Sequence, residues 1–296
     1  MFDNSAEFWV EVSVEVPGSL CDAVCNFVIE NLSNGIVLED EEDSAVTTIK
    51  FYIPDNGVEQ SRQQLGAYLT SLVAMDNELQ TVPEIRQKKI KSAEWEDEYR
   101  KSVKVTVVGG DVAVRPPWEN APPEAKYDII VEPKMAFGTG THETTQGCLL
   151  AIRDNGFAGM RFLDLGCGSG ILAILADKMK AGYIKAIDYD LLAVENCGEN
   201  FIINKVAAPH DIVHGSIEKC EDDEPYDFVC ANIIKSTILD ILESLDKLTA
   251  PGGYLVLSGL LEQDEQGITD GLQSLGLTNF SIHAENEWRT FTVHKE

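Results

Sequence analysis

A glycine-rich stretch, Asp164-Leu165-Gly166-Cys167-Gly168-Ser169-Gly170, has the residue types of a loop that brings backbone close to a nucleotide-like ligand. It lies between the apolar pair Phe162-Leu163 and the apolar run 171–175, so we expect a strand, a turn and a helix. Glycine lacks a Cβ and tolerates positive φ, which permits such close approach. The G-x-G-x-G spacing disfavours the G-x-G-x-x-G dinucleotide fingerprint, because Ile171 occupies the position of its third glycine. A purely structural turn is the alternative.

Asp188 and Asn232 each end an apolar segment that we expect to be a strand of one sheet, and ligands bind beyond the carboxyl ends of such strands. Asp188 lies 22 residues after Gly166, where a carboxylate can accept hydrogen bonds from both hydroxyls of a ribose. Dinucleotide enzymes share this spacing, so Asp188 predicts ribose binding but does not distinguish between cofactors that contain ribose. Nearby Asp190 is interpreted as a turn or helix-cap residue. Asn232 is a neutral amide that can accept a hydrogen bond from a substrate amine, and its alternative role is to begin a turn.

A second glycine loop, 137–142, precedes a helix that we expect to begin near Glu143. Its small residues, together with the hydroxyls of Thr144 and Thr145, suit a carboxylate at a helix N-terminus. His142 is interpreted as structural rather than catalytic. The sequence has no metal-ligand spacing, nucleophile elbow or paired carboxylates that compete with this set, and we therefore predict no metal site.

The net charge of −27 disfavours direct binding of nucleic acid, because contacts to phosphates need clustered Lys and Arg. Residues 1–80 hold 15 acidic residues and only two basic ones, Lys50 and Arg62. Such a surface can attract a basic protein, although a solvated acidic coat is the simpler alternative.

The chain shows no sign of a membrane or export segment. No apolar run approaches the roughly 20 residues that span a bilayer, and the acidic start lacks a signal-peptide core. The seven scattered cysteines are expected to be buried free thiols in a reducing cytosol, so we expect a cytoplasmic protein. A monomer is the default expectation, and the sequence leaves the oligomeric state open.

Periodicity divides the 296 residues into two domains and a connector. Residues 1–92 give strands at 8–16, 35–38, 46–53 and 81–90 with two helices between them, the order β-α-β-β-α-β of a ferredoxin-like sandwich. Residues 93–126 contain a short charged helix, a hairpin around Gly109-Gly110 and four prolines, and are interpreted as a semi-rigid linker.

Residues 127–296 alternate strands and helices, which predicts an α/β domain with a mostly parallel sheet covered on both faces. After a first apolar strand at 129–131, the expected strands are 161–165, 183–188, 211–213, 226–231, 253–258, 278–283 and 289–294. We see no internal repeat.

Taken in order, these motifs resemble the bacterial methyltransferases of large-subunit ribosomal protein eleven, the PrmA family. The resemblance covers nearly the whole chain and rests on five segments: 137–142 with Thr144-Thr145, 164–172, Ala231-Asn232-Ile233, Leu257-Ser258-Gly259-Leu260, and Pro117-Trp118-Glu119 in the linker. It departs from the family at Glu143, where proline is common, and at Lys235, near which a small residue is usual.

The resemblance implies a class I methyltransferase with a seven-stranded Rossmann-like sheet and S-adenosylmethionine as cofactor. It implies methylation of lysine side chains and of the N-terminal amine of a basic ribosomal protein, which the first domain would recognise. The cofactor-contacting positions that it implies are Thr145, Gly166, Asp188 and Asn232, with Gly168 in the same loop. Asn232 would also orient the substrate amine.

Three other functions stay open at this point. The chain is alternatively a class I methyltransferase of another protein or of a small molecule. It is alternatively a module that binds the cofactor or a partner without catalysis, although the intact loop, Asp188 and Asn232 argue against such decay. A nicotinamide oxidoreductase is disfavoured by the glycine spacing.

Overall fold

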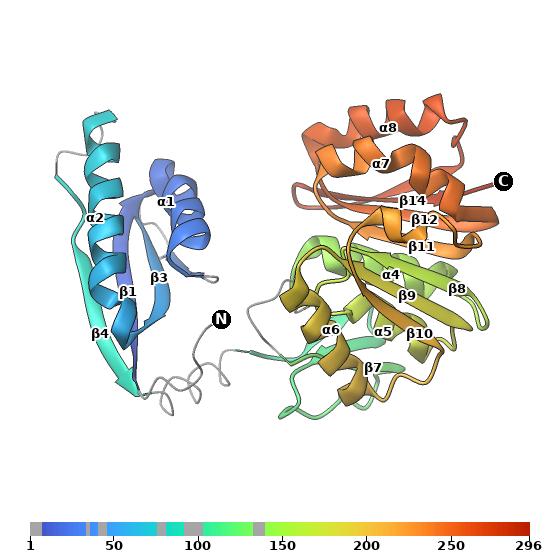
Figure 1. Cartoon of the computed structure of the whole chain (residues 1–296), viewed down its shortest axis with the longest axis horizontal. Helices are drawn as coiled ribbons and strands as arrows, with labels where there is room; N and C mark the ends of the chain where they lie inside the picture. Colours follow the sequence, from blue (N-terminus) through green and yellow to red (C-terminus); the bar gives the residue numbers. More distant parts are fainter. Residues whose placement is uncertain (1–7, 34–35, 41–45, 76–80, 92–102, 133–139) are drawn as a thin grey trace. The chain divides into compact units, whose positions relative to one another are not determined.

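The computed structural model describes residues 8–33, 36–40, 46–75, 81–91, 103–132 and 140–296. The chain divides into two compact units, Met1–Val103 and Lys104–Glu296 (Figure 1). The helix predicted over 93–101 lies outside the described residues, as do Phe137, Gly138 and Thr139 of the second glycine loop.

The first unit has a four-stranded antiparallel sheet with strand order β2-β3-β1-β4. Its elements are β1 (Phe8–Pro17), α1 (Gly18–Asn31), β2 (Ile36–Asp40), β3 (Val46–Pro54), the 3₁₀ helix η1 (Asp55–Gly57), α2 (Val58–Met75) and β4 (Ile85–Lys91). The order β-α-β-β-α-β is the one that the periodicity predicts. Classification of this unit as ferredoxin-like stays a prediction.

Alternation along β1 gives this sheet one apolar face, because the valines at even positions from 10 to 16 are buried whereas Glu15 is exposed. Apolar residues of α1 and α2 pack on the same face and join these valines in one core. The two helices also contact each other, since the rings of Phe27 and Tyr68 stack with their centroids 4.1 Å apart. The first unit therefore has a hydrophobic core of its own.

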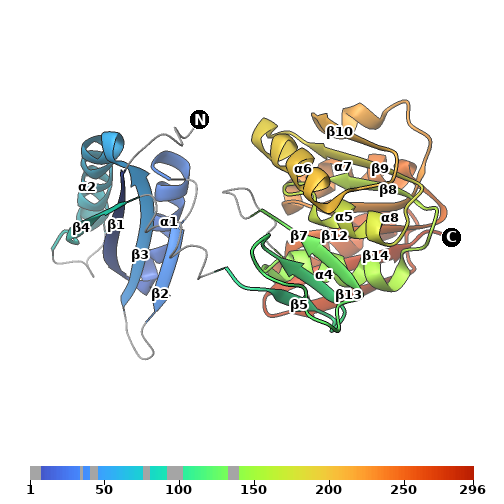
Figure 2. The ribbon, with the colours of Figure 1, turned by 90° about the horizontal axis from the view of Figure 1, so that it is seen from below.

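Residues 104–126 differ from the predicted linker. They form β5 (Thr106–Val108) and β6 (Val112–Arg115), joined by the predicted hairpin, and β6 pairs in parallel with β7 (Tyr127–Ile130). This small sheet contacts α4, α5 and α6 (Figure 2), and Val108, Val112 and Val114 are buried in the core of the second unit. The prolines do not interrupt this sheet, because they lie in the turn between β6 and β7, where no backbone N–H is needed for strand pairing. The linker prediction is thus corrected over 104–126.

The second unit contains a seven-stranded sheet with helices on both faces (Figure 1). Its further elements are α4 (Glu143–Asn155), β8 (Arg161–Leu165), α5 (Ile171–Lys178), β9 (Tyr183–Asp188), α6 (Leu191–Asn204), β10 (His210–His214), η2 (Ile217–Cys220), β11 (Tyr226–Asn232), α7 (Lys235–Leu248), β12 (Thr249–Leu261), η3 (Glu262–Asp264), α8 (Glu265–Ser274), β13 (Phe280–Glu285) and β14 (Trp288–His294).

The sheet order is β10-β9-β8-β11-β12-β14-β13, with parallel pairing from β10 to β12 and antiparallel pairing of the last two strands. Successive residues of a strand enter opposite cores. Phe162 of β8 packs with α4, α5 and α6, whereas Leu163 packs with α7 and α8. Each of the seven strands predicted from 161 onward is observed, which confirms the Rossmann-like α/β fold.

The fold places the first glycine loop, Asp188 and Asn232 at one edge of the sheet. β8, β9 and β11 are parallel, and the loop, Asp188 and Asn232 follow or end these strands at their carboxyl ends. Six of the seven cysteines are buried. Within the described ranges, no helix is both long and apolar enough to cross a membrane.

A chain that begins at Lys104 should fold cooperatively, because it keeps β5, β6 and the complete core of the second unit. A chain that begins at Tyr127 loses the buried valines at 108, 112 and 114. Since burial of one valine contributes about 1.5–3 kcal/mol, this chain should have a free energy of unfolding lower by at least about 3 kcal/mol. Urea unfolding followed by circular dichroism measures the difference, and equal stabilities would contradict the placement of 104–126 in the second unit.

Candidate active site

The loop between β8 and α5 owes its glycine spacing to backbone conformation. Gly166, Gly168 and Gly170 have φ values of 76°, 51° and 77°, a left-handed region that other residues rarely adopt. Space adds a second constraint. A Cβ on Gly166 would lie 2.5 Å from Cγ2 of Ile233, and a Cβ on Gly170 would lie 2.6 Å from Sγ of Cys197. The turn therefore needs glycine at these positions.

The carboxylate of Asp188 is held by the loop. Its Oδ2 accepts a hydrogen bond from the Gly168 amide at 2.9 Å, and its Oδ1 accepts one from the Asp190 amide at 3.0 Å. Asp188 is only 8% exposed, so these two hydrogen bonds replace part of the hydration that the carboxylate loses on burial. Each carboxylate oxygen can still accept a further hydrogen bond. Asp190 caps α6 by accepting a hydrogen bond from the Leu192 amide at 2.9 Å, which confirms its predicted role.

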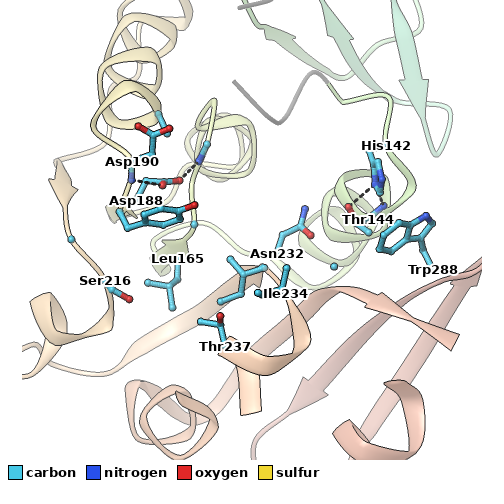
Figure 3. A pocket seen from close by; sticks show the side chains of 17 residues that line it. His142, Thr144, Leu165, Asp188, Asp190, Ser216, Asn232, Ile234, Thr237 and Trp288 are labelled. Atoms are coloured by element: carbon cyan, nitrogen blue, oxygen red, sulfur yellow. Dashed lines mark hydrogen bonds between the residues drawn. The ribbon is translucent and has the colours of Figure 1, made fainter. Parts of the chain in front are cut away.

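A cavity of about 700 Å³ opens at this edge of the sheet. Four of the five predicted site residues line it, namely Gly166, Gly168, Asp188 and Asn232. Figure 3 shows Asp188 and Asp190 on one side of the cavity, His142, Thr144 and Trp288 on the other, and Asn232 between them. The structure thus brings residues of three strand ends to one cavity.

Asn232 lies at the end of β11, where it pairs with Ser258 of β12. Among the residues that the structure describes, its side-chain amide has no hydrogen-bond partner, so both amide atoms are available to a ligand. Ile233 and Ile234 line the same cavity, and Ile234 is 67% exposed. This part of the cavity therefore combines one neutral polar group with apolar surface.

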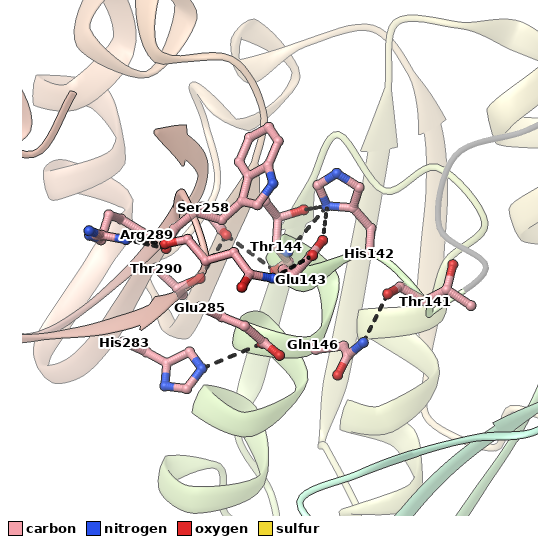
Figure 4. A network of polar contacts seen from close by, with 12 residues as sticks. Thr141, His142, Glu143, Thr144, Gln146, Ser258, His283, Glu285, Arg289 and Thr290 are labelled. Carbon is pink, nitrogen blue, oxygen red and sulfur yellow. Dashed lines mark hydrogen bonds and ion pairs between the residues drawn. The ribbon is translucent and has the colours of Figure 1, made fainter. Parts of the chain in front are cut away.

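His142 and Trp288 form the far side of the cavity (Figure 3), and Figure 4 shows the polar contacts around His142. His142 is the N-cap of α4, because its Nδ1 accepts a hydrogen bond from the Thr144 amide at 3.3 Å and lies 2.8 Å from Thr144 Oγ1. The indole of Trp288 meets the His142 ring edge-on, with centroids 4.8 Å apart. His142 thus has the structural role that the sequence favours, and its ring contributes to the wall of the cavity as well.

Hydroxyl groups fix the start of α4 to the sheet. Ser258 Oγ donates a hydrogen bond to the Thr144 carbonyl at 3.1 Å and lies 2.8 Å from Thr290 Oγ1, and all three residues are buried. A Cβ on Gly147 would overlap the Thr290 hydroxyl, so glycine allows this close packing of helix and strand. Trp288 lies two residues before Thr290 on β14. The contacts of Ser258 and Thr290 therefore position both the His142 ring and the Trp288 indole.

Glu143, where the family commonly has proline, binds the turn that precedes Trp288. Its Oε1 accepts a hydrogen bond from Asn286 Nδ2 at 3.1 Å. The backbone amide of Glu143 and, to a smaller extent, this bond to Asn286 hold the pKa of the Glu143 carboxyl below its usual value. The carboxylate therefore stays ionised at neutral pH and helps to hold the turn of β13 and β14.

Thr145 is the predicted site residue that lies apart from the others. It is 1% exposed and is not part of the cavity wall, whereas Thr144, one position earlier, is. The Oγ1 of Thr145 is buried without a hydrogen-bond partner within the described part of the chain. A contact between Thr145 and a cofactor stays a prediction, and Thr144 supplies the threonine surface that lines the cavity.

The cavity lining includes residues that the sequence analysis did not single out, among them Tyr189, Ser216 and Trp288. Tyr189 follows the end of β9 and Ser216 follows the end of β10, so their position after parallel strands was an available signal. Trp288 gave no such signal, because it begins an antiparallel strand near the end of the chain. It reaches the cavity only through the pairing of β14 with β12.

Asp164, at the start of the glycine loop, is a buried acid. It is fully buried, its Oδ2 accepts a hydrogen bond from the Ala173 amide at 3.2 Å, and its Oδ1 has no partner among the described residues. The pKa of Asp164 is raised to about 7, mainly by burial. The hydrogen bond from the Ala173 amide lowers the pKa, and the nearby charge of Asp188 adds a smaller rise. Asp164 therefore holds its proton up to near neutral pH.

Comparison with known proteins matches the chain over almost its whole length. The model of the family described as "Ribosomal protein L11 methyltransferase (PrmA)" matches residues 8–296. The chain belongs to this family. A protein of Geotalea daltonii named ribosomal protein L11 methyltransferase is 33% identical, over 97% of this chain and 98% of its own length. One of the same name from Nitratiruptor is 32% identical, over 98% of this chain and 97% of its own length.

A solved structure agrees with this membership of the PrmA family. The crystal structure of a ribosomal protein L11 methylase from Lactobacillus delbrueckii subsp. bulgaricus has a TM-score of 0.58 and 26% sequence identity. It covers 65% of this chain and 99% of its own chain. The family predicted from the sequence motifs is therefore confirmed.

The described residues fit a nucleoside cofactor of a PrmA methyltransferase. Glycines leave the loop surface free of Cβ atoms, the Asp188 carboxylate has fixed orientation and remaining acceptor capacity, and Leu165 and Ile233 add apolar surface. The volume of the cavity is in the usual range for ligand sites, roughly 300–1,000 Å³. Within the described ranges, no group of three or more His, Cys, Asp or Glu residues could hold a metal ion.

Because the pKa of Asp164 is raised, we expect the free energy of unfolding to depend on pH. Because the folded chain holds this proton where the unfolded chain has lost it, the contribution of Asp164 to the free energy of unfolding falls as pH rises from about 4 to about 7. Asp164→Asn cannot ionise, so between pH 5 and pH 7 the wild type should lose roughly 2 kcal/mol relative to this variant. Urea titrations at several pH values measure this difference, and a difference that does not change with pH would refute the buried-acid assignment.

Proposed function

We propose that this PrmA-family methyltransferase transfers methyl groups from S-adenosylmethionine to amino groups of ribosomal protein L11, namely lysine side chains and the N-terminal amine. Family membership supports the reaction class, and relatives named ribosomal protein L11 methyltransferase support the substrate. The structural observation that carries the proposal is that a fixed carboxylate, a glycine loop and a neutral amide line a single cavity. The choice of amino groups rests on the resemblance.

The glycine loop and Asp188 would hold the cofactor. The Asp188 carboxylate would accept hydrogen bonds from the ribose hydroxyls, while the amides of Gly168 and Asp190 keep its oxygens in place. When bound, S-adenosylmethionine supplies a methyl group on a positively charged sulfur. Because this group is already activated, the residues of the chain mainly need to bind, orient and exclude water.

Asn232 would orient the substrate amine. Its side-chain oxygen can accept a hydrogen bond from the nitrogen, which directs the lone pair of the neutral amine. A carboxylate in this place would stabilise the ammonium form, which has no lone pair and cannot attack. A neutral amide on apolar surroundings, here Ile233 and Ile234, avoids that penalty.

Trp288 and His142 would form the wall that receives the substrate side chain. Both line the cavity on the side of Asn232 that is remote from Asp188 (Figure 3). The hydroxyls of Ser258 and Thr290 hold the start of α4 against β14 and thereby position this wall. An aromatic surface suits the methylene chain of lysine and, through its π face, a methylated ammonium group.

The first unit would recognise the protein substrate. Residues 1–80 carry 15 acidic and two basic residues, and two of the basic residues that follow on β4 are paired, Arg86 with Glu15 and Lys89 with Asp55. This net negative charge would attract a basic ribosomal protein. We further propose that the protein works in the cytoplasm as a monomer, without direct contact to nucleic acid or membrane.

Cofactor binding tests the role of Asp188. Asp188→Ala should weaken the binding of S-adenosylmethionine by about 1–3 kcal/mol, because the ribose loses its charged hydrogen-bond acceptor. Asp190→Ala is the matched control, since Asp190 lines the same cavity but uses its side chain to cap α6, and it should lower stability by about 1 kcal/mol with a smaller change in affinity. Isothermal calorimetry measures both. Unchanged affinity in the Asp188 variant would exclude the ribose contact.

Methyl transfer tests the proposed function as a whole. With labelled S-adenosylmethionine and a mixture of ribosomal proteins, label should enter L11, and mass spectrometry should locate it on lysine and N-terminal amines. Asn232→Ala should keep cofactor affinity within a few-fold and slow transfer roughly hundredfold, because the amine is no longer oriented.

A chain beginning at Lys104 should bind the cofactor and fail to methylate L11.

Each alternative has a distinct outcome in these assays. Binding of the cofactor with label on another protein or on a small molecule would support a methyltransferase of different substrate. Binding without transfer to any acceptor would support a module without catalysis. Full activity of the chain that begins at Lys104 would show that the first unit is not the recognition element.

A further inference from the structure

Helix α6 carries three buried asparagines on one face, Asn196, Asn200 and Asn204, spaced four residues apart. They are 3%, 0% and 6% exposed. Buried amides are costly unless they are hydrogen-bonded, so a row of them in a helix that packs on the core calls for a physical reason. The mechanism described above uses none of the three.

Two of these asparagines bind the end of β7 in place of a neighbouring strand. The Asn204 side chain accepts a hydrogen bond from the Ile130 amide at 2.9 Å and donates one to the Ile130 carbonyl at 2.6 Å. One helical turn earlier, Asn200 Oδ1 accepts a hydrogen bond from the Glu132 amide at 3.0 Å. Four helical residues and two strand residues span nearly the same length, about 6 and 6.6 Å, so the two rows match.

Asn200 makes one contact that Asn204 does not. Its Nδ2 donates a hydrogen bond to the Ser169 carbonyl at 2.9 Å, in a buried environment. Ser169 lies between Gly168, whose amide binds Asp188, and Gly170, the N-cap of α5. A single side chain therefore connects the end of β7, helix α6 and the glycine loop.

The orientation of the Asn200 amide follows from its partners. Oδ1 faces a donor, the Glu132 amide, while Nδ2 faces two acceptors, the Ser169 carbonyl and Asn196 Oδ1 at 3.4 Å. A flipped amide would place oxygen against oxygen at Ser169. The contact to the loop is therefore specific for a side chain that donates and accepts at once.

We propose that Asn200 is a positioning residue for the cofactor loop: it fixes the Ser169 carbonyl and thereby holds the Gly168 amide against Asp188. This inference rests on the proposed function, because it treats the loop as a cofactor site. The three left-handed glycines give the loop little conformational restraint of its own, so the loop depends on such outside contacts. The small sheet β5-β6-β7 thereby acts on cofactor binding although it does not line the cavity.

Paired substitutions in the full chain separate this role from general stability. Asn200→Leu and Asn204→Leu keep the number and branching of the side-chain heavy atoms, and each removes hydrogen bonds to the end of β7. Only the first removes the contact to Ser169. Both should lower the melting temperature. Calorimetry should show S-adenosylmethionine binding weakened roughly tenfold by Asn200→Leu and changed less than about twofold by Asn204→Leu.

Hydrogen exchange without cofactor gives a second readout. The amides of Gly168 and Gly170 should exchange faster in Asn200→Leu than in Asn204→Leu, because only the former loses the Ser169 contact. Asn200→Gln retains a donor and an acceptor and should recover part of the affinity. If Asn200→Leu does not fold, Asn200→Ser is compared with Asn204→Ser under the same criteria.

Equal effects of the two leucine variants on affinity and exchange, or no effect of either, would overturn the inference. A wild type that fails to bind S-adenosylmethionine would instead overturn the proposed function. In that case the exchange rates of the glycine amides still decide whether Asn200 positions the loop. The two ideas therefore fail through different measurements.

Discussion

Two backbone amides, those of Gly168 and Asp190, hold the Asp188 carboxylate at the carboxyl edge of the sheet, and the rest of the site depends on this arrangement. The Gly168 amide can reach Asp188 only because the chain after β8 turns through left-handed conformations, which requires glycine. Parallel pairing of β8 with β9 then brings loop and carboxylate together. The hydrogen bond from the Gly168 amide to the Asp188 carboxylate thus explains the glycine spacing, the position of Asp188 and the open surface beside them.

The cavity separates two tasks along its length. Charged groups, Asp188 and Asp190, lie on one side, whereas the neutral amide of Asn232 and the aromatic rings lie away from them (Figure 3). This distribution suits a reaction in which one partner is bound through hydroxyls and the other must be a neutral amine. The hydroxyl contacts of Ser258 and Thr290 connect the start of α4, which carries His142, to the sheet strand that carries Trp288.

Sequence reasoning succeeds where a local physical rule decides the structure. Apolar runs bounded by turns predict all seven strands of the large sheet, and glycine spacing predicts the turn at 166–170. It fails where tertiary pairing decides. The sequence predicts the hairpin around Gly109-Gly110 but not the parallel pairing of β6 with β7, which places 104–126 in the second unit. Trp288 reaches the cavity through the pairing of β14 with β12, and Thr144 lines the cavity whereas Thr145 does not. Periodicity and motif spacing do not predict these tertiary arrangements.

The most direct test of the account is a crystal structure of the chain with S-adenosylhomocysteine, the demethylated product. We expect both ribose hydroxyls within hydrogen-bonding distance of the Asp188 carboxylate, roughly 2.5–3.0 Å, with the sulfur on the side of the cavity that Asn232 lines. An empty cavity, or a ligand whose ribose lies away from Asp188, would contradict the claim that this edge of the sheet is the cofactor site.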